Sequence, residues 1–361
     1  MAYYHSKYSR PRNKKKSRVK RFFIWFFIIV LLLLGGAGYY VYRVVFDPNV
    51  WTPEGKSVSI YIPTGSQFED VREILYSNGL IIHRKNFEWW AQQKKYTGKI
   101  KPGHYVIEHG LSNEELINML RSGKQTPVRV TFNNIRNLYQ LSGKVSKQIE
   151  ADSISIIDYL KSPELLVRKN IDSANLKGVF LPNTYEFWWN TTSEEFVERM
   201  FEENEKFWNT GRLEKVTLIG LTKEEVVTLA SIVEKETNKN DEKPAIAGVY
   251  LNRLRSKWRL QADPTVVYAI GDFSIRRVLN KHKKYDSPYN TYENMGLPPG
   301  PICIPSIASI DAVLNYEKHD FMYFCARADL SGYHAFAETN AQHRRNARAY
   351  QKALDERGIF E

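Results

Sequence analysis

The hydrophobic pattern begins with an uncharged run of 21 residues from Phe22 to Tyr42. As a helix rising about 1.5 Å per residue, it would span roughly 31 Å, close to a hydrocarbon core of about 30 Å. Tyr39, Tyr40 and Tyr42 are placed like an interfacial aromatic belt. A buried helix and a cleaved signal peptide are the alternatives, but the run lacks a polar face and a clear cleavage site. We expect a transmembrane helix.

Residues 57–125 alternate between short strand-like and helix-like segments. Ser57–Ile62 has the period of a strand, two helical stretches follow, and His104–Ile107 is strand-like again. A further helix over 112–122 completes a small subdomain. The segment 43–56, with its Asp-Pro and Thr-Pro steps, predicts a short linker from the membrane.

Residues 126–361 are long enough for a second, larger domain. A strand over Val128–Phe132 precedes helices, an aromatic stretch at Gly178–Trp189, a long amphipathic helix over 193–208 and a helix at the carboxyl end. The aromatic stretch suits a core, and a sugar-stacking wall is the alternative. Because strands and helices mix without a steady βαβ alternation, the predicted fold class is α+β.

The charge is concentrated at the amino terminus. The chain of 361 residues has a net charge of +12, but residues 1–43 hold ten basic and no acidic residues, which leaves 42 basic against 40 acidic residues beyond. No basic body therefore argues for a nucleic-acid partner. Nine of those basic residues precede the apolar run, which predicts a cytoplasmic tail over 1–21 and places the rest of the chain outside the cytoplasmic membrane.

The cysteines and histidines suggest no metal centre. Cys303 and Cys325 are too few for a disulfide scaffold, and either a bridge or two free thiols would fit. The eight histidines show no metal-ligand spacing. We expect neither a metal nor a cofactor.

A candidate acid lies at the end of a predicted helix. Thr222 and Glu225 form a capping box that opens it. On a helical wheel Glu236 lies about 20° from Leu229, beside the apolar stripe, whereas Glu234 lies about 140° away. A carboxyl carried toward the interior favours its neutral form and can act as a general acid. A solvated helix end is the alternative.

Several blocks of the sequence keep a fixed spacing around a Gly/Pro-rich run: Ala230–Thr237, Asn252–Leu254, Leu260–Tyr268, Tyr289–Tyr292, Gly296–Ile302, Tyr323–Phe324, His334–Phe336 and Thr339. Together they cover about 225–343 closely. In these blocks the chain resembles the YceG-like family of membrane-anchored endolytic murein transglycosylases.

The resemblance implies a lytic transglycosylase with Glu236 as its essential residue. It also implies a LysM-like subdomain at 57–125, a YceG-like catalytic domain at 126–361, and peptidoglycan glycan strands as substrate. The resemblance makes peptidoglycan synthases candidate partners. The nascent strands that emerge from these synthases would be cut near the membrane, and the cut would end their elongation.

By analogy with related transglycosylases, five residues are candidates for orienting the sugar: Gln261, Asp263, Asn290, Thr291 and Tyr292. Each has a simpler alternative, such as a helix cap for Asp263 or a turn for Asn290 and Thr291. His334 could support the core or contact substrate. Three positions depart from the family pattern: Lys177, Asn183 and Cys303.

Two other functions compete with this interpretation. A catalytically silent wall-binding adaptor would recruit synthesis proteins, but the retained Glu236, Gln261 and Asp263 argue against it. A hydrolytic muramidase would need a second acidic residue or a positioned water, and Asp263 is the only nearby acidic candidate.

Overall fold

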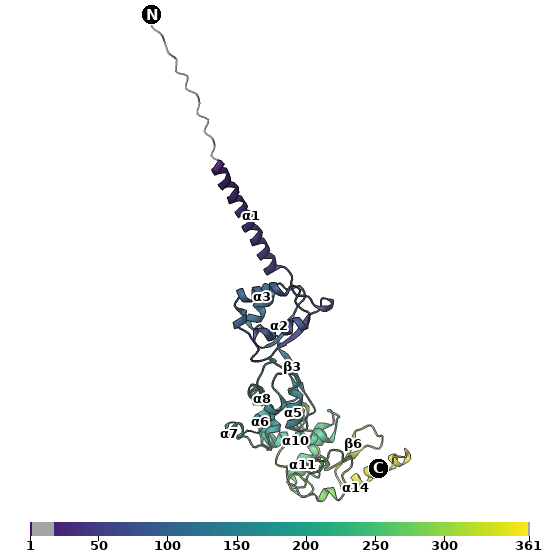
Figure 1. Cartoon of the computed structure of the whole chain (residues 1–361). Helices are drawn as coiled ribbons and strands as arrows, with labels where there is room; N and C mark the ends of the chain where they lie inside the picture. Colours follow the sequence, from purple (N-terminus) through teal and green to yellow (C-terminus); the bar gives the residue numbers. More distant parts are fainter. Residues whose placement is uncertain (2–17, 360–361) are drawn as a thin grey trace. The chain divides into compact units, whose positions relative to one another are not determined.

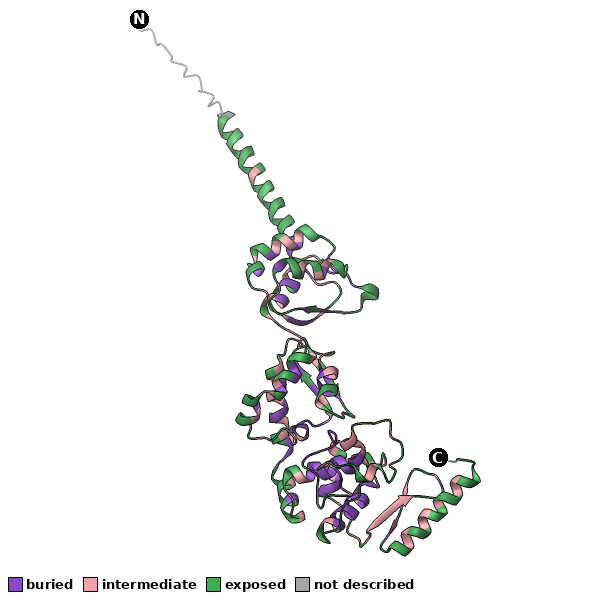
Figure 2. Ribbon diagram, turned by 60° about the horizontal axis from the view of Figure 1, so that its bottom comes forward, coloured by how far each residue is buried: buried purple, intermediate pink, exposed green. Residues whose placement is uncertain are grey.

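The structure, a computed structural model, describes residue 1 and residues 18–359. It divides into two compact units, Met1–Thr126 and Pro127–Glu361. Most of the basic tail expected over 1–21 lies outside the described residues. Helix α1 (Arg18–Phe46) confirms the expected helix and extends it at both ends (Figure 1). It is long and apolar enough to cross a membrane, and its side chains are exposed along most of its length (Figure 2).

The first unit contains the expected strand–helix–helix–strand order and one further helix. Strands β1 and β2 pair antiparallel, with Val58 opposite Ile107. Phe87, Tyr96 and Tyr105 are fully buried in its core. A LysM-like identity for this subdomain stays a prediction. Its elements are η1 (Pro53–Gly55), β1 (Val58–Ile62), α2 (Phe68–Ser77), α3 (Arg84–Gln93), η2 (Tyr96–Gly98), β2 (Gly103–Ile107) and α4 (Asn113–Ser122).

The segment 43–56, expected to be a linker, packs into this unit instead. Asn113 donates its side-chain amide to the Val44 carbonyl at 2.7 Å, and the Asn49 amide donates to Asn113 Oδ1 at 2.7 Å. Val50 is buried and pairs with Ile81 in an isolated bridge. These buried hydrogen bonds hold the end of α1 against the rest of the unit, so the segment 43–56 allows little movement between the helix and the unit.

The second unit is a mixed α+β fold, as predicted. Its small sheets each pair two strands, β3 with β4 and β5 with β6, both antiparallel. Its elements are β3 (Val128–Phe132), α5 (Leu138–Val145), α6 (Ser153–Lys161), α7 (Pro163–Arg168), η3 (Leu176–Val179), β4 (Asn183–Phe187), α8 (Ser193–Phe207), α9 (Thr210–Ile219), α10 (Lys223–Glu236), α11 (Lys243–Arg255), α12 (Asp263–Ile270), η4 (His282–Lys284), α13 (Ile307–Leu314), β5 (Tyr323–Ala326), β6 (His334–Ala337) and α14 (Asn340–Glu356).

Two hydrophobic clusters form the interior of the second unit. One gathers β3, β4 and helices α5 to α8, and Phe180, Tyr185 and Phe187 of the aromatic stretch are buried in it, whereas Trp188 is exposed. The other surrounds α10, α11 and α13. The Ile304 amide donates to the Ile135 carbonyl at 3.0 Å, and both residues belong to the first cluster. Ile302 belongs to the second cluster, so the segment 302–304 passes from one cluster to the other. Helix α10 lies close to this segment, because Ser231 accepts a hydrogen bond from the Ile302 amide at 2.9 Å.

Helix α10 forms as its sequence predicts. Thr222 Oγ1 accepts the Glu225 amide at 3.2 Å, and Glu225 accepts the Thr222 amide at 2.7 Å, which completes the capping box. Every residue from Val226 to Val233 is buried. In the neighbouring α11, a Cβ at Gly248 would lie 2.4 Å from the Glu317 carbonyl oxygen, so only glycine fits that contact.

Candidate active site

Glu236 is the last residue of α10, and α11 supplies its main partner. Its side chain is partly buried, and the hydroxyl of the buried Tyr250 donates a hydrogen bond to its Oε1. Helices α10 and α11 pack directly on each other, so this contact is fixed by the core beneath it. The Glu236 side chain therefore turns toward the interior, as the helical wheel predicted.

The surroundings of Glu236 raise its pKa to about 7, well above the ordinary 4.5. Burial is the main cause, because it penalises the charged carboxylate. The hydrogen bond from Tyr250 and the positive charge of Arg253 oppose the shift, and the negative charge of Asp263 adds to it. Near neutral pH the carboxyl is therefore present in both forms, which suits a group that must give and then take a proton.

Glu236 lies in the wall of a groove of about 360 Å³. That volume lies within the range of small-molecule sites. Apolar and aromatic side chains form much of its wall, with charged groups between them. The lining residues are Arg136, Lys235, Glu236, Asp263, Pro264, Val267, Tyr268, Phe273, Ile275, Arg276, Val278 and Ile302.

Asp263 is the second carboxylate of this groove. It begins α12 and is exposed, and its Oδ1 accepts a hydrogen bond from the Tyr292 hydroxyl at 2.6 Å. The helix-cap role that the sequence left open for Asp263 is absent, because the cap residue of α12 is Ala262. Asp263 and Tyr292 thus come together beside Glu236, and burial together with that hydrogen bond raises the pKa of Tyr292.

The other three sugar-orienting candidates lie differently. Asn290 is fully buried, and its amide donates to the carbonyls of Lys283 and Tyr285 at 2.9 and 2.7 Å. Thr291 is buried, and its hydroxyl accepts the Ala262 amide at 3.0 Å. These contacts match the turn roles that the sequence left open.

Gln261 is exposed and has a left-handed backbone with φ 53°. The backbone amide of Gln261 donates a hydrogen bond to the carbonyl of Thr291 at 3.1 Å. Gln261 does not line the groove. A left-handed conformation is uncommon outside glycine. The hydrogen bond to the 290–292 loop is what holds this strained turn in place at the start of α12.

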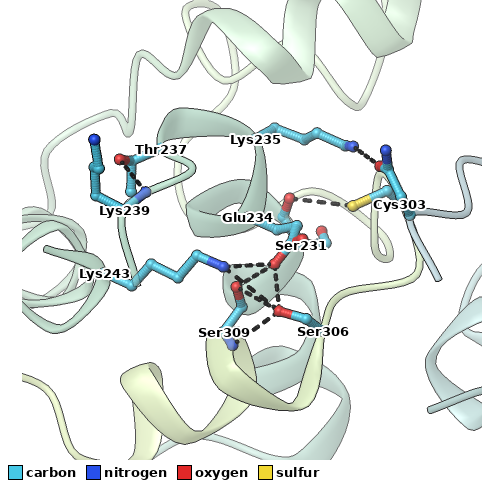
Figure 3. A network of polar contacts seen from close by, with 10 residues as sticks. Ser231, Glu234, Lys235, Thr237, Lys239, Lys243, Cys303, Ser306 and Ser309 are labelled. Atoms are coloured by element: carbon cyan, nitrogen blue, oxygen red, sulfur yellow. Dashed lines mark hydrogen bonds and ion pairs between the residues drawn. The ribbon is translucent and has the colours of Figure 1, made fainter. Parts of the chain in front are cut away.

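Glu234, two residues before Glu236, belongs to a separate polar network (Figure 3). Its Oε2 accepts hydrogen bonds from Ser306 at 2.6 Å, from Ser309, and from the buried Lys243 at 3.0 Å. Burial opposes ionisation of Glu234, but these donors outweigh it and lower its pKa. The two glutamates therefore differ in charge near neutral pH, since Glu234 is held ionised whereas Glu236 is still partly neutral.

Several groups at the site escape prediction from the sequence. Tyr250 lies in an apolar stretch of α11, where a tyrosine would be taken for a core residue. It contacts Glu236, which lies 14 residues earlier in the chain, only because α11 packs against α10. Arg136 and Arg276 lie far from α10 in the sequence and join the groove through the fold. No local spacing signals these contacts.

Of the three positions that depart from the family pattern, Lys177 and Cys303 are buried, and Asn183 is exposed at the start of β4. Lys177 is buried, and its ammonium donates to the hydroxyl of the groove residue Tyr268 at 2.6 Å. Cys303 is buried, and neither it nor Cys325 forms a disulfide. His334 pairs with the buried Glu242 at 2.7 Å, which favours the core-support alternative. Among the residues that the structure describes, no cluster of His, Cys, Asp or Glu is placed to hold a metal ion.

The chain belongs to the YceG-like family, whose pattern matches residues 60–349. The resemblance seen in the sequence is therefore confirmed. The chain is 32% identical to the endolytic murein transglycosylase of Bacillus subtilis, in an alignment that covers 83% of this chain and 87% of that protein. It is 30% identical to the endolytic murein transglycosylase of Streptococcus pneumoniae, with 86% of this chain covered and 61% of the longer relative.

A solved structure supports the same fold. The crystal structure of a yceG-like protein from Listeria monocytogenes superposes with a TM-score of 0.54 at 26% identity. The superposition covers 80% of this chain and 98% of the Listeria chain.

Proposed function

We propose that this chain is an endolytic murein transglycosylase that cuts MurNAc–GlcNAc bonds and leaves 1,6-anhydro-MurNAc ends. The observation that carries the proposal is Glu236, a partly buried carboxyl in a groove, with a pKa of about 7. The names of the Bacillus and Streptococcus relatives point to the same activity.

In the first step Glu236 acts as a general acid. Its neutral carboxyl donates a proton to the oxygen between MurNAc and GlcNAc, and that bond breaks as the leaving hydroxyl forms. The N-acetyl group of MurNAc stabilises the developing positive charge in place of a second carboxylate. Tyr250 keeps the carboxyl oriented by its hydrogen bond to Oε1.

In the second step the ionised Glu236 acts as a base. It takes the proton of the MurNAc C6 hydroxyl, whose oxygen bonds to C1 and closes the 1,6-anhydro ring. The acid is regenerated, and no water enters the product. A pKa near the working pH supports both steps, because the protonated and the ionised forms of the carboxyl are then both well populated.

Asp263 has a supporting role in this scheme. A hydrolytic muramidase would use it as a second catalytic carboxylate. Its oxygen is instead engaged by Tyr292, and its negative charge raises the pKa of Glu236. We assign Asp263 and Tyr292 to orienting the sugar and keeping the acid protonated, and Gln261, Asn290 and Thr291 to shaping the loop around them.

The membrane anchor gives the activity its place. Helix α1 would cross the cytoplasmic membrane with the basic tail inside and the residues after Asp47 outside. Because 43–56 packs into the first unit, that unit would stay at the membrane, where strands emerge from synthases. A strand still attached at its growing end would be cut internally, and its elongation would stop.

Product analysis tests the proposed function. The full-length chain in detergent is incubated with uncrosslinked glycan strands, and the new ends are identified by mass spectrometry. The proposal expects anhydro ends from the native chain and none from Glu236→Gln. A catalytically silent adaptor would bind the strands and release no product from either.

A further inference from the structure

Three positively charged side chains line the groove together with Glu236. Arg136 comes from the loop between β3 and α5, Lys235 from α10, and Arg276 from the loop after α12. All three are exposed. Residues from three separate segments thus bring positive charge to one site.

These cations have no acidic partner among the described residues. No carboxylate of the described chain lies within ion-pair distance of Arg136, Lys235 or Arg276, although fourteen ion pairs form elsewhere, from Arg43–Asp47 to Lys352–Glu356. The side chains of Arg136 and Lys235 contact neutral groups. The Arg136 guanidinium lies 3.9 Å from the centre of the Phe273 ring, and Lys235 reaches Asn134 Oδ1 at 3.5 Å, away from the Glu234 network (Figure 3).

The charge balance of the groove is therefore positive. Its lining holds three cations against Asp263 and the partly neutral Glu236. Arg136 lies in the loop before α5, and Phe273 lies in the loop after α12. Their cation–π contact holds the Arg136 guanidinium in position at the groove. Uncompensated guanidinium and ammonium groups in a substrate groove are suited to bind an anion on the substrate.

We infer that this groove binds a carboxylate carried by the glycan strand beside the MurNAc ring, through Arg136, Lys235 and Arg276. The inference rests on the proposed function, because the sugar backbone itself carries no charge. Two carboxylates of murein share this chemistry: those of the stem peptide, and that of the lactyl group when the peptide is absent. Recognition of either would select peptidoglycan over uncharged polysaccharides of similar shape.

Binding measurements on the full-length chain test the inference. All variants carry Glu236→Gln, so that strands stay intact during the measurement. Arg136→Gln, Lys235→Gln and Arg276→Gln are combined in one triple variant. At roughly 0.2–1 kcal/mol for each exposed charge pair, every lost cation weakens binding about 1.4- to 5-fold, and the triple change about tenfold.

Two control proteins separate charge recognition from folding. Arg344→Gln, Arg345→Gln and Arg348→Gln remove the same charge from the exposed face of α14, outside the groove, and should alter binding less than twofold. A charge-keeping variant exchanges lysine for arginine and arginine for lysine at the three groove positions. It should restore most of the affinity if positive charge is what matters.

The strands are offered in three forms: with stem peptides, stripped by an amidase, and with all carboxyls chemically amidated. The inference expects the tenfold loss on carboxylate-bearing strands and no difference between variants on amidated ones. A loss on stripped strands alone assigns the lactyl carboxylate, a loss on peptide-bearing strands alone assigns the stem peptide, and a loss on both means that the groove accepts either carboxylate. Equal binding of the groove triple and its parent, or an equal loss on amidated strands, would overturn it. Anhydro products from the native chain, measured in parallel, keep the proposed function a separate question.

Discussion

Replacing Glu236 by glutamine should make the second unit more stable above neutral pH while it abolishes cleavage. Burial holds the pKa of Glu236 at about 7, so the fold opposes an ionisation that the unfolded chain makes near 4.5. Glutamine keeps the shape and can accept the Tyr250 hydrogen bond, but it cannot ionise. The substitution therefore removes a cost that the native residue carries at alkaline pH.

The magnitude follows from proton linkage. A raised folded-state pKa means that the folded protein binds more protons between pH 4.5 and 7, so its stability falls as pH rises through that window. A shift of about 2.5 pKa units at about 1.36 kcal/mol each gives roughly 3 kcal/mol at pH 8. The same treatment gives only about 0.4 kcal/mol at pH 4.5.

Glu234→Gln is a matched control on the same helix. The lowered pKa of Glu234 means that its carboxylate stabilises the fold above its unfolded-state pKa. Its loss leaves the buried Lys243 without its charge partner, so this variant should be destabilised by about 2 kcal/mol at pH 8. Two identical substitutions, two residues apart, should thus have opposite signs.

The measurement is hydrogen exchange of the α10 and α11 amides in the full-length chain, at pH 4.5 and pH 8, which reports the opening free energy of this region. Cleavage is assayed on the same samples, with an expected loss of about 10²- to 10⁴-fold for Glu236→Gln. The reasoning would be refuted if Glu236→Gln gave no stabilisation at pH 8, or if Glu234→Gln stabilised the region.

The remaining predictions concern the acid, the anchor and the mode of cutting. Tyr250→Phe removes a hydrogen bond that favours the ionised acid, so the alkaline limb of the pH–rate profile should move to higher pH; an unmoved limb would show that Tyr250 does not act on Glu236. Protease added to spheroplasts should digest the region after Asp47, and full protection would reverse the assigned orientation. Early digests of long strands should release anhydro-ended oligosaccharides of mixed length, whereas disaccharides alone would indicate cutting from a strand end.

Local sequence signals predicted the elements that carry the site. The apolar run predicted α1, the capping box at Thr222 predicted the start of α10, and the helical wheel turned Glu236 toward the interior. Each of these signals depends on neighbours within a few residues, and the structure keeps them because propensity and burial agree.

These local signals could not predict contacts between segments that lie far apart in the sequence. Tyr250 reads as a core residue, and its meeting with Glu236 depends on how α10 and α11 pack. Glu234 was placed on the far side of the wheel, yet Lys243 and α13 bury it in a network of its own. The proline-rich segment 43–56 resembled a linker, because its buried hydrogen bonds involve partners more than 60 residues away, such as Asn113.

The central claim is that Glu236 performs both proton transfers without water. Digestion of uncrosslinked strands in water enriched with heavy oxygen tests it most directly, since hydrolysis would place a solvent oxygen at the new MurNAc end. The account predicts anhydro ends free of the label from the native chain and no new ends from Glu236→Gln. Labelled reducing ends, or anhydro ends from Glu236→Gln, would contradict it.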